Sequence, residues 1–215
     1  MKKRKTIIAA IILLLICFVG GTIAYFTDND SATNKFTIGD VDITLTEDAW
    51  DGLTDTTPAN GIPDIAENMM PGESVTKDPT INNVSTKNPA YVFAKVEVPC
   101  TTIVAPETTA KELFTYTPNN GWTELTGEKI ACTDGGTATH IYYYGTNNTL
   151  EVLAKATDAS TPTSTDTPVF SKVTLLDTLK GNEVTTGTKQ IVVTGYGIQT
   201  TGLDSTAPAD VWDLF

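Results

Sequence analysis

Alternating hydrophobic and polar positions recur through the chain after residue 36, and they predict β-strands rather than helices. The clearest alternation covers residues 90–98. One side of this segment carries Val92, Ala94, Val96 and Val98, and the other carries Tyr91, Phe93, Lys95 and Glu97. Because successive side chains of a strand point to opposite faces of its sheet, this pattern predicts a strand with one apolar core face.

Further segments show strand-like patterns bounded by turn residues. They are residues 39–46, 74–84, 139–145, 169–176 and 189–200. The alternation changes frame at Gly39-Asp40, which predicts a bulge or a strand corner. Pro79 has no backbone N–H to donate, so we expect a break in its segment. Gly195 and Gly197 predict close backbone approach in the last strand.

The segments between these strands have other patterns. Residues 48–68 and 154–168 are rich in turn-forming and polar residues, which predicts loops. Residues 106–114 predict a short helix that starts near Pro106. We also expect a small hairpin between residues 121–125 and 129–132. Residues 207–215 predict a terminal helix that packs Val211, Trp212 and Phe215.

Short strands separated by turns are typical of an all-β protein. The pattern favours an antiparallel β sandwich. We therefore expect one sandwich domain over residues 36–215, with a helical and hairpin insertion at about 100–132.

The first 24 residues have the pattern of a secretory signal peptide, which would form a signal helix. Four basic residues, Lys2 to Lys5, precede an apolar run, and the small residues Thr22 and Ala24 suit a cleavage site. Cleavage after Ala24 makes Tyr25 the first mature residue. Two alternatives are a retained membrane anchor, because the apolar run approaches a spanning length, and a lipoprotein modified at Cys17.

Residues 25–35 follow the predicted cut and form a polar segment with few apolar residues, among them Phe26 and Ala32. Their alternation is poor, so a core strand is not expected. Taken alone, the segment is typical of a flexible N-terminal arm.

The net charge of the chain is −12 at pH 7. Nucleic-acid binding requires clustered Lys and Arg to meet the phosphates, so the acidity argues against a nucleic-acid partner. It also argues against binding of the body to an anionic membrane surface. Any membrane contact is then expected only through the uncleaved signal peptide.

Cys100 and Cys132 are the two cysteines that remain after cleavage. In an exported protein they are candidates for a disulfide that closes the insertion. The alternative is two buried thiols. A metal site is disfavoured because the chain contains one histidine.

Motifs for catalysis are missing from the sequence: it contains no H-E-x-x-H, G-x-S-x-G or P-loop pattern. His140, the single histidine, is interpreted as a solvated or core-edge residue rather than a base or ligand. Three adjacent tyrosines at 142–144 suggest a carbohydrate platform or, alternatively, core packing with one ring at the surface. Residues 60–64 only faintly resemble a calcium loop. No cofactor is predicted.

Several stretches in the same order resemble the TasA/camelysin family. They are GGTIAYFTD, NKFTIGDVDITLTE, PGESVTKDPTINN, AYVFAKVEVP, IYYYG with VFSKV, and QIVVTGYGIQTTG. Members of this family are exported with a dedicated SipW-type signal peptidase. The resemblance spans most of the chain outside residues 100–125.

The resemblance implies a jelly-roll-like sandwich secreted to the cell surface or biofilm matrix. It implies fibres built by donor-strand complementation, in which the N-terminal arm of one subunit completes the next. Tyr25, Phe26 and Ala32 would then belong to the donor strand. The implied partners are a SipW-type peptidase, further copies of the chain and accessory matrix proteins.

Two other functions are weighed against this expectation. A monomeric surface adhesin or carbohydrate-binding module is the alternative from a different class. The camelysin name also carries a metalloprotease activity. This sequence departs from familiar zinc-protease patterns, so we expect no enzyme.

Overall fold

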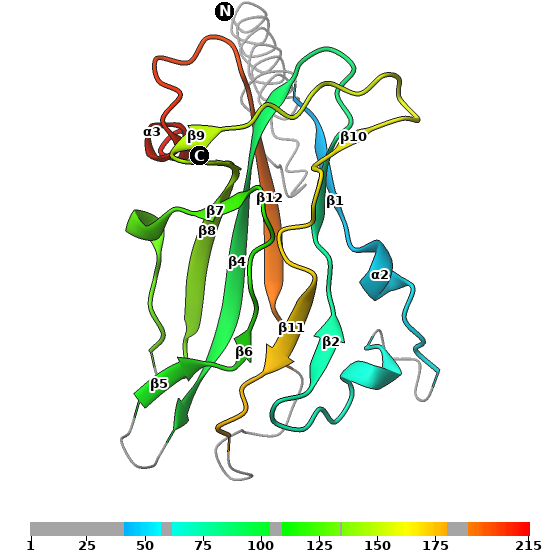
Figure 1. Cartoon of the computed structure of the whole chain (residues 1–215), viewed down its shortest axis with the longest axis vertical. Coiled ribbons are helices and arrows are strands. Elements are labelled where there is room, and N and C mark those ends of the chain that lie inside the picture. The colour runs from blue at the N-terminus through cyan, green and yellow to red at the C-terminus, as the bar shows by residue number, and fades with distance from the viewer. Residues whose placement is uncertain (1–40, 57–61, 104–108, 134, 180–188) are drawn as a thin grey trace, which may run out of the picture. The chain divides into compact units, whose positions relative to one another are not determined.

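The computed structural model of the chain describes residues 41–56, 62–103, 109–133, 135–179 and 189–215 (Figure 1). These residues belong to one compact unit that begins at Thr37, whereas the unit Met1–Phe36 lies outside them. The predicted signal helix, the arm at 25–35 and the frame shift at Gly39 therefore also lie outside the described residues.

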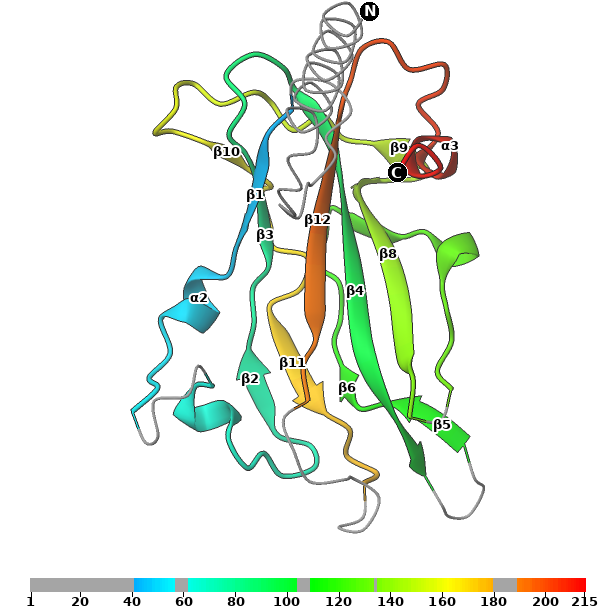
Figure 2. The same cartoon turned by 180° about the vertical axis from the view of Figure 1, so that it is seen from behind.

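The largest sheet has β4 (Ala90–Ile103) near its centre. It is flanked by β12 (Val192–Gln199) on one side and by β8 (Thr137–Thr146) on the other, and β7 (Trp122–Glu124) follows β8. All these pairs are antiparallel. The predicted strands at 90–98, 139–145 and 189–200 are thus confirmed and are neighbours (Figure 2).

Two three-stranded sheets face the large one. The first has the order β1 (Ile43–Thr46), β3 (Thr80–Asn83) and β10 (Thr163–Ser164). The second has the order β2 (Ser74–Thr76), β11 (Lys172–Leu175) and β6 (Phe114–Thr115). The predicted break at Pro79 is confirmed, because β2 and β3 lie on either side of it and belong to different sheets.

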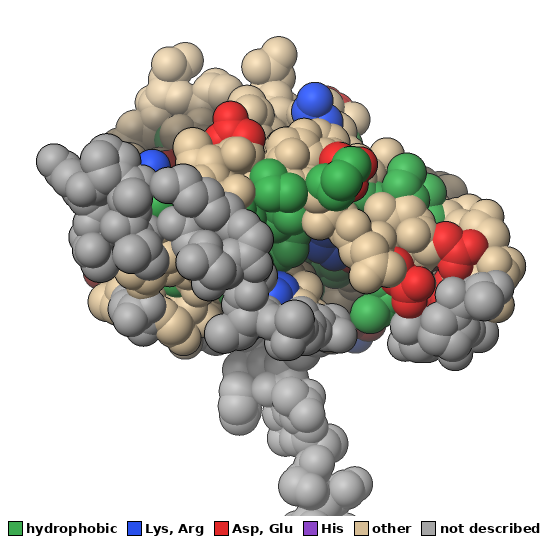
Figure 3. All heavy atoms as spheres, turned by 90° about the horizontal axis from the view of Figure 1, so that it is seen from below, with side chains coloured by type: hydrophobic (Ala, Val, Ile, Leu, Met, Phe, Trp, Pro, Cys, Tyr) green, Lys and Arg blue, Asp and Glu red, His purple; other side chains and the backbone are tan. Residues whose placement is uncertain are grey.

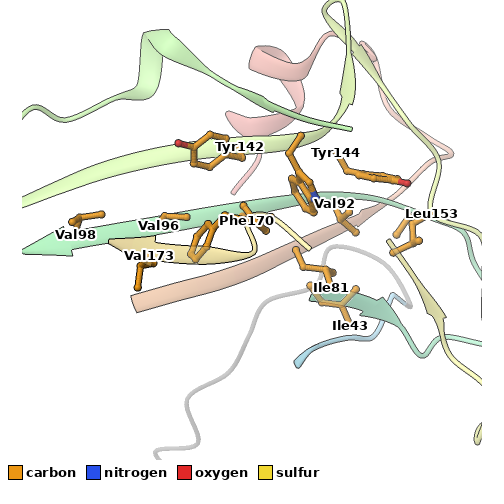
Figure 4. Packing of buried hydrophobic residues seen from close by; sticks show 14 of the residues in the cluster. Ile43, Ile81, Val92, Val96, Val98, Tyr142, Tyr144, Leu153, Phe170 and Val173 are labelled. Atoms are coloured by element: carbon orange, nitrogen blue, oxygen red, sulfur yellow. The ribbon is translucent and has the colours of Figure 1, made fainter. Parts of the chain in front are cut away.

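The main core lies between the large sheet and the two small ones. Val92, Val96 and Val98 of β4 are fully buried there. Ile43 and Ile81 of the first small sheet, and Val173 of the second, pack toward them (Figure 4). Full burial of such an aliphatic side chain contributes about 1.5–3 kcal/mol. The all-β, antiparallel sandwich expected from the sequence is therefore confirmed.

A second core covers the opposite face of the large sheet. The short helix α3 (Pro208–Trp212) buries Val211 against it, as the sequence predicted. Phe93 is fully buried, and its ring centroid lies 5.6 Å from that of Trp212 and 5.7 Å from that of Phe215. Because both faces of the sheet are covered here, residues of both parities along β4 are buried.

A third cluster closes the end of the sandwich where β4 and β11 finish. It contains Ile103, Leu113, Leu175 and Leu179. Hydrophobic side chains also reach the surface at this end (Figure 3). Ile65 and Met70, which precede β2, are 59% and 64% exposed.

The insertion differs from its prediction in two ways. Residues 109–112 are not helical: β5 (Thr109–Glu112) pairs with the last residues of β4. The expected hairpin between 121–125 and 129–132 is also wrong. Instead β7 pairs with β8, and Ile130 forms a bridge to Thr139 of the same strand. These segments therefore take their structure from long-range pairing with β4 and β8 and not from a local helix or hairpin.

The remaining elements are short. The predicted loop at 48–68 contains α2 (Asp48–Asp51) and a 3-10 turn, η1 (Asp64–Ala66). A second 3-10 turn, η2 (Thr126–Glu128), follows β7. β9 (Thr149–Leu150) returns along β8 after the turn at Asn147-Asn148, where both residues have positive φ.

Candidate functional site

Among the described residues, the large sheet and the first small sheet each end in a strand with one unpaired edge. Within the described ranges, β12 pairs only with β4, and β1 pairs only with β3. β1 and β12 lie beside each other (Figure 2), yet no ladder joins them within those ranges. We call these two neighbouring edges the β1–β12 seam. A row of unpaired N–H and C=O groups is a template for an additional strand.

The two glycines of β12 bring β1 close to it. A Cβ placed on Gly197 would lie 2.9 Å from Ile43 Cγ2 and 3.3 Å from Val41 Cγ1. At Gly195 the nearest atom would be Ile81 Cδ1, at 3.4 Å. The close approach predicted from these glycines is therefore confirmed, and it lets β1 cover the core without a ladder to β12.

The strands of the seam are apolar and uncharged. The sequences are ITLT for β1 and VVTGYGIQ for β12. Leu45, Ile191 and Val193 are only partly buried against the main core, and Val192 is 45% exposed. An added strand would therefore find both backbone partners and apolar side chains to cover.

The second candidate site is a charged cluster at the other side of the large sheet. It is centred on His140 of β8, whose side chain is 6% exposed. His140 Nε2 lies 2.9 Å from Glu112 Oε1 of β5, and His140 Nδ1 lies 2.6 Å from Glu124 Oε1 of β7. Lys129 Nζ lies 3.8 Å from the same oxygen of Glu124. His140 is thus a buried residue at the core edge, held by two carboxylates, and not a solvated one.

Strand register explains how the three residues meet. Val96 pairs with His140, Cys100 with Glu112, and Tyr142 with Glu124. The paired positions are all even-numbered residues of β4 and β8, whose side chains lie on one face of the sheet. The side chains of His140, Glu112 and Glu124 therefore all point toward the inner face. Neither glutamate was predicted as a partner of His140, because Glu112 was expected in a helix and Glu124 in a hairpin that does not form.

The electrostatics favour a protonated histidine. Burial acts to lower the pKa of His140, but hydrogen bonds to Glu112 and Glu124 outweigh it and raise this pKa above its ordinary value. The hydrogen bond to His140 in turn lowers the pKa of Glu112. Two tyrosines border the cluster: burial raises the pKa of Tyr142 to about 12 and that of Tyr116 further still. Both phenols therefore stay neutral at physiological pH.

The cluster does not fit a zinc centre. Both ring nitrogens of His140 already bind carboxylates, so neither is directed at a shared metal position. In the parts of the chain that the structure describes, no three His, Cys, Asp or Glu side chains are grouped to hold a metal ion. The arrangement suits a structural ion network better than metal-assisted hydrolysis.

The candidate carbohydrate platform is also not formed. Tyr142, Tyr143 and Tyr144 are 3%, 3% and 4% exposed, so all three rings lie in the cores rather than one at the surface. This burial results from the two cores on opposite faces of β8. Residues 60–61 of the faint calcium loop lie outside the described residues, and both carboxylate oxygens of Asp64 accept hydrogen bonds from Thr56.

The other residues singled out in the sequence divide into two groups. Ala24, Tyr25, Phe26 and Ala32 lie outside the described residues. Cys100 and Cys132 are joined by a disulfide with a Cα–Cα distance of 5.7 Å. This bond ties the end of β4 to the segment before β8, beside Glu112, which is the cross-strand partner of Cys100.

These features define an all-β sandwich protein with an uncharged edge seam and a buried ion network. Residues 1–105 match the family model described as camelysin metallo-endopeptidase. This match supports the resemblance of the chain to the TasA/camelysin family. Searches of curated proteins and of solved structures found no match. None of the helices in the described ranges has the length and hydropathy to span a membrane.

Proposed function

We propose that the chain is a secreted structural protein of the cell surface or biofilm matrix, and that it assembles into fibres by donor-strand complementation. Residues 25–35 of one copy would pair along the β1–β12 seam of the next. The observation that carries the proposal is the long, uncharged edge of β12 beside the edge of β1, which has no strand partner among the described residues. Such a contact is head-to-tail and does not close, so it propagates as a filament.

The reach of the N-terminal arm is compatible with pairing along the seam of another subunit. The eight residues of β12 span about 27 Å as an extended strand. Residues 25–40, which precede the first described residue, reach at most about 55 Å if extended. The arm is therefore long enough to leave its own subunit and cover the seam of another.

Export fits the same proposal. The basic and apolar leader supports cleavage by a SipW-type signal peptidase after Ala24, which would free Tyr25 and the arm. We propose that the chain acts as a building element without enzymatic activity, because the single histidine is held by two carboxylates. Accessory matrix proteins are proposed as further partners.

The decisive experiment is negative-stain electron microscopy of the purified mature chain together with a variant that lacks residues 25–35. We expect filaments from the mature chain and monomers from the deletion variant. Adding a synthetic peptide of residues 25–36 to the mature chain should stop growth, because the peptide would cap the seam. A deletion variant that polymerises normally would contradict the proposal.

Two valines provide a matched pair of variants. Val192 on β12 is 45% exposed, and Val152, which follows β9, is 49% exposed. Val192→Lys places a charge on the edge strand, a device that blocks strand addition, whereas Val152→Lys changes a surface away from the seam. We expect only V192K to abolish filaments, while both variants keep the wild-type thermal stability to within about 0.5 kcal/mol. Equal filament formation by both would assign assembly to another surface.

A further inference from the structure

The buried ion network connects side chains of three strands, β5, β7 and β8. His140 on β8 binds Glu112 on β5 through one ring nitrogen and Glu124 on β7 through the other. β5 and β7 each form an outer part of the insertion, and within the described ranges β5 pairs only with β4 and β7 only with β8. In addition to these ladders, His140 therefore gives β8 a side-chain contact to each of the two outer strands.

Both contacts need a proton on His140. A neutral imidazole has one N–H donor and one acceptor nitrogen, while the imidazolium has two donors. Ionised carboxylates only accept. With distances of 2.6 and 2.9 Å to the two carboxylates, loss of one proton would place a nitrogen lone pair against a carboxylate oxygen. The geometry thus distinguishes the two protonation states.

The charges in the cluster balance when His140 is protonated. Glu112 and Glu124 face it from β5 and β7, and Lys129 approaches Glu124 at 3.8 Å. Tyr116 and Tyr142 border the ring and remain neutral, and their hydroxyls lie 3.2 Å apart. Two acids and two bases therefore balance. When His140 is neutral, one of the two partly exposed carboxylates loses its charged hydrogen-bond donor.

We propose that protonated His140 is a latch that fastens β5 and β7 to β8, and that raising the pH releases this side of the sandwich. The Cys100–Cys132 disulfide limits how far the released segment moves, because it ties the two ends of the insertion. This inference is independent of fibre assembly, since it concerns strands on the opposite side of the large sheet from the seam.

The pH range follows from the direction of the shifts. Because the folded-state pKa of His140 is raised above its ordinary 6.5, the latch is complete below that value and is lost as the pH rises through the raised pKa. The pKa of Glu112 is lowered from its ordinary 4.5, so the latch weakens again only when the pH falls through the lowered value. The insertion is held most firmly in mildly acidic solution.

The test uses the mature chain, in which His140 is the single histidine and gives one unambiguous imidazole NMR signal. We expect its titration midpoint above 6.5. The variants Glu112→Gln and Glu124→Gln should each lower it by about one pH unit or more, because each removes a charged partner. Glu97→Gln, which affects a pair on the other face of the sheet, should leave it unchanged. A wild-type midpoint at or below 6.5 would overturn the latch.

Hydrogen exchange measured on the same protein reports the release itself. After correction for the intrinsic pH dependence of exchange, amides of β5 and β7 should exchange at least about tenfold faster once His140 is neutral, whereas those of β12 should not change. The double variant Cys100→Ser, Cys132→Ser should enlarge the difference. Equal protection of β5, β7 and β12 across the titration would overturn the proposal, even if the midpoint is raised.

Discussion

The two edges of the large sheet are protected to different degrees. β7 is three residues long, its Glu124 is bound by His140 and Lys129, and a disulfide closes the insertion that contains it. β12 is eight residues long and carries no charged residue and no proline. Natural sheets shield an exposed edge with shortness, charge or proline. The β7 edge has the first two of these features, and the β12 edge has none of them.

This difference indicates which edge accepts another strand. An edge that is short, charged and covalently anchored resists pairing with other chains. A long, flat and uncharged edge would be a hazard for an isolated monomer, and it is useful when a partner strand is meant to cover it. The comparison therefore supports the assembly proposal independently of the family match.

The largest expected effect on stability concerns the disulfide of the protected edge. Replacing Cys100 and Cys132 by serine opens a loop with a sequence separation of 32 residues. In the chain-entropy model this lowers the free energy of unfolding by about 3–4 kcal/mol. Chemical denaturation of the double variant, compared with the oxidised wild type, measures the loss. A change below about 1 kcal/mol would show that the disulfide contributes little beyond the strand pairing and the ion network.

The second effect concerns His140→Ala. The substitution leaves Glu112 and Glu124 without their shared partner in a position where the imidazole is 6% exposed. We expect a loss of about 2 kcal/mol at pH 6, because two charge-assisted hydrogen bonds to partly exposed carboxylates are removed. The loss should shrink as the pH rises through the raised pKa of His140. Thr139→Ala, at the adjacent position on the other face, is the control and should change stability by less than about 0.5 kcal/mol.

The third effect concerns the seam. Gly197→Ala would place a Cβ 2.9 Å from Ile43 Cγ2, so β1 has to shift away from β12. We expect a loss of about 1–2 kcal/mol from overpacking. Thermal unfolding measures it. Gly127→Ala is the matched control, since nothing lies within 4 Å of its added Cβ. Equal stability of the two variants would mean that β1 adapts without cost.

The smallest effect concerns the outer face of β4. Lys95 and Glu97 form an ion pair at 3.1 Å with side chains 28% and 33% exposed. Glu97→Gln should lower the free energy of unfolding by no more than about 0.5 kcal/mol. Denaturation at low and at high salt checks it, and any difference from wild type should vanish at high salt. A loss as large as that of H140A would remove the distinction between the exposed and the buried pairs.

Alternation along the chain was sufficient to predict the long strands. Residues 90–98 alternate clearly, residues 189–200 form an uninterrupted strand-like run, and both are strands of the large sheet. The break at Pro79, which separates two sheets, could also be predicted, because the missing N–H belongs to the proline itself. Gly195 and Gly197 likewise indicated close packing before any neighbour was known.

The insertion and the charged cluster were beyond such local patterns. Residues 109–112 contain helix-compatible Ala, Lys and Glu, and their strand state depends on pairing with the end of β4. His140 had no partner within several residues along the chain. Glu124 and Glu112 lie 16 and 28 positions away from it, and only the sheet register brings them to its two nitrogens.

The sequence by itself determined the all-β class, the strands with one apolar face, the break at Pro79 and the family resemblance. These depend on properties that each residue carries locally: side-chain alternation, a missing N–H and glycine without a Cβ. The tertiary structure alone decided which edges lack partners, that all three tyrosines are buried, and that His140 joins Glu112 to Glu124. Those features depend on which distant strands become neighbours, because strand pairing is a long-range interaction that no local pattern encodes.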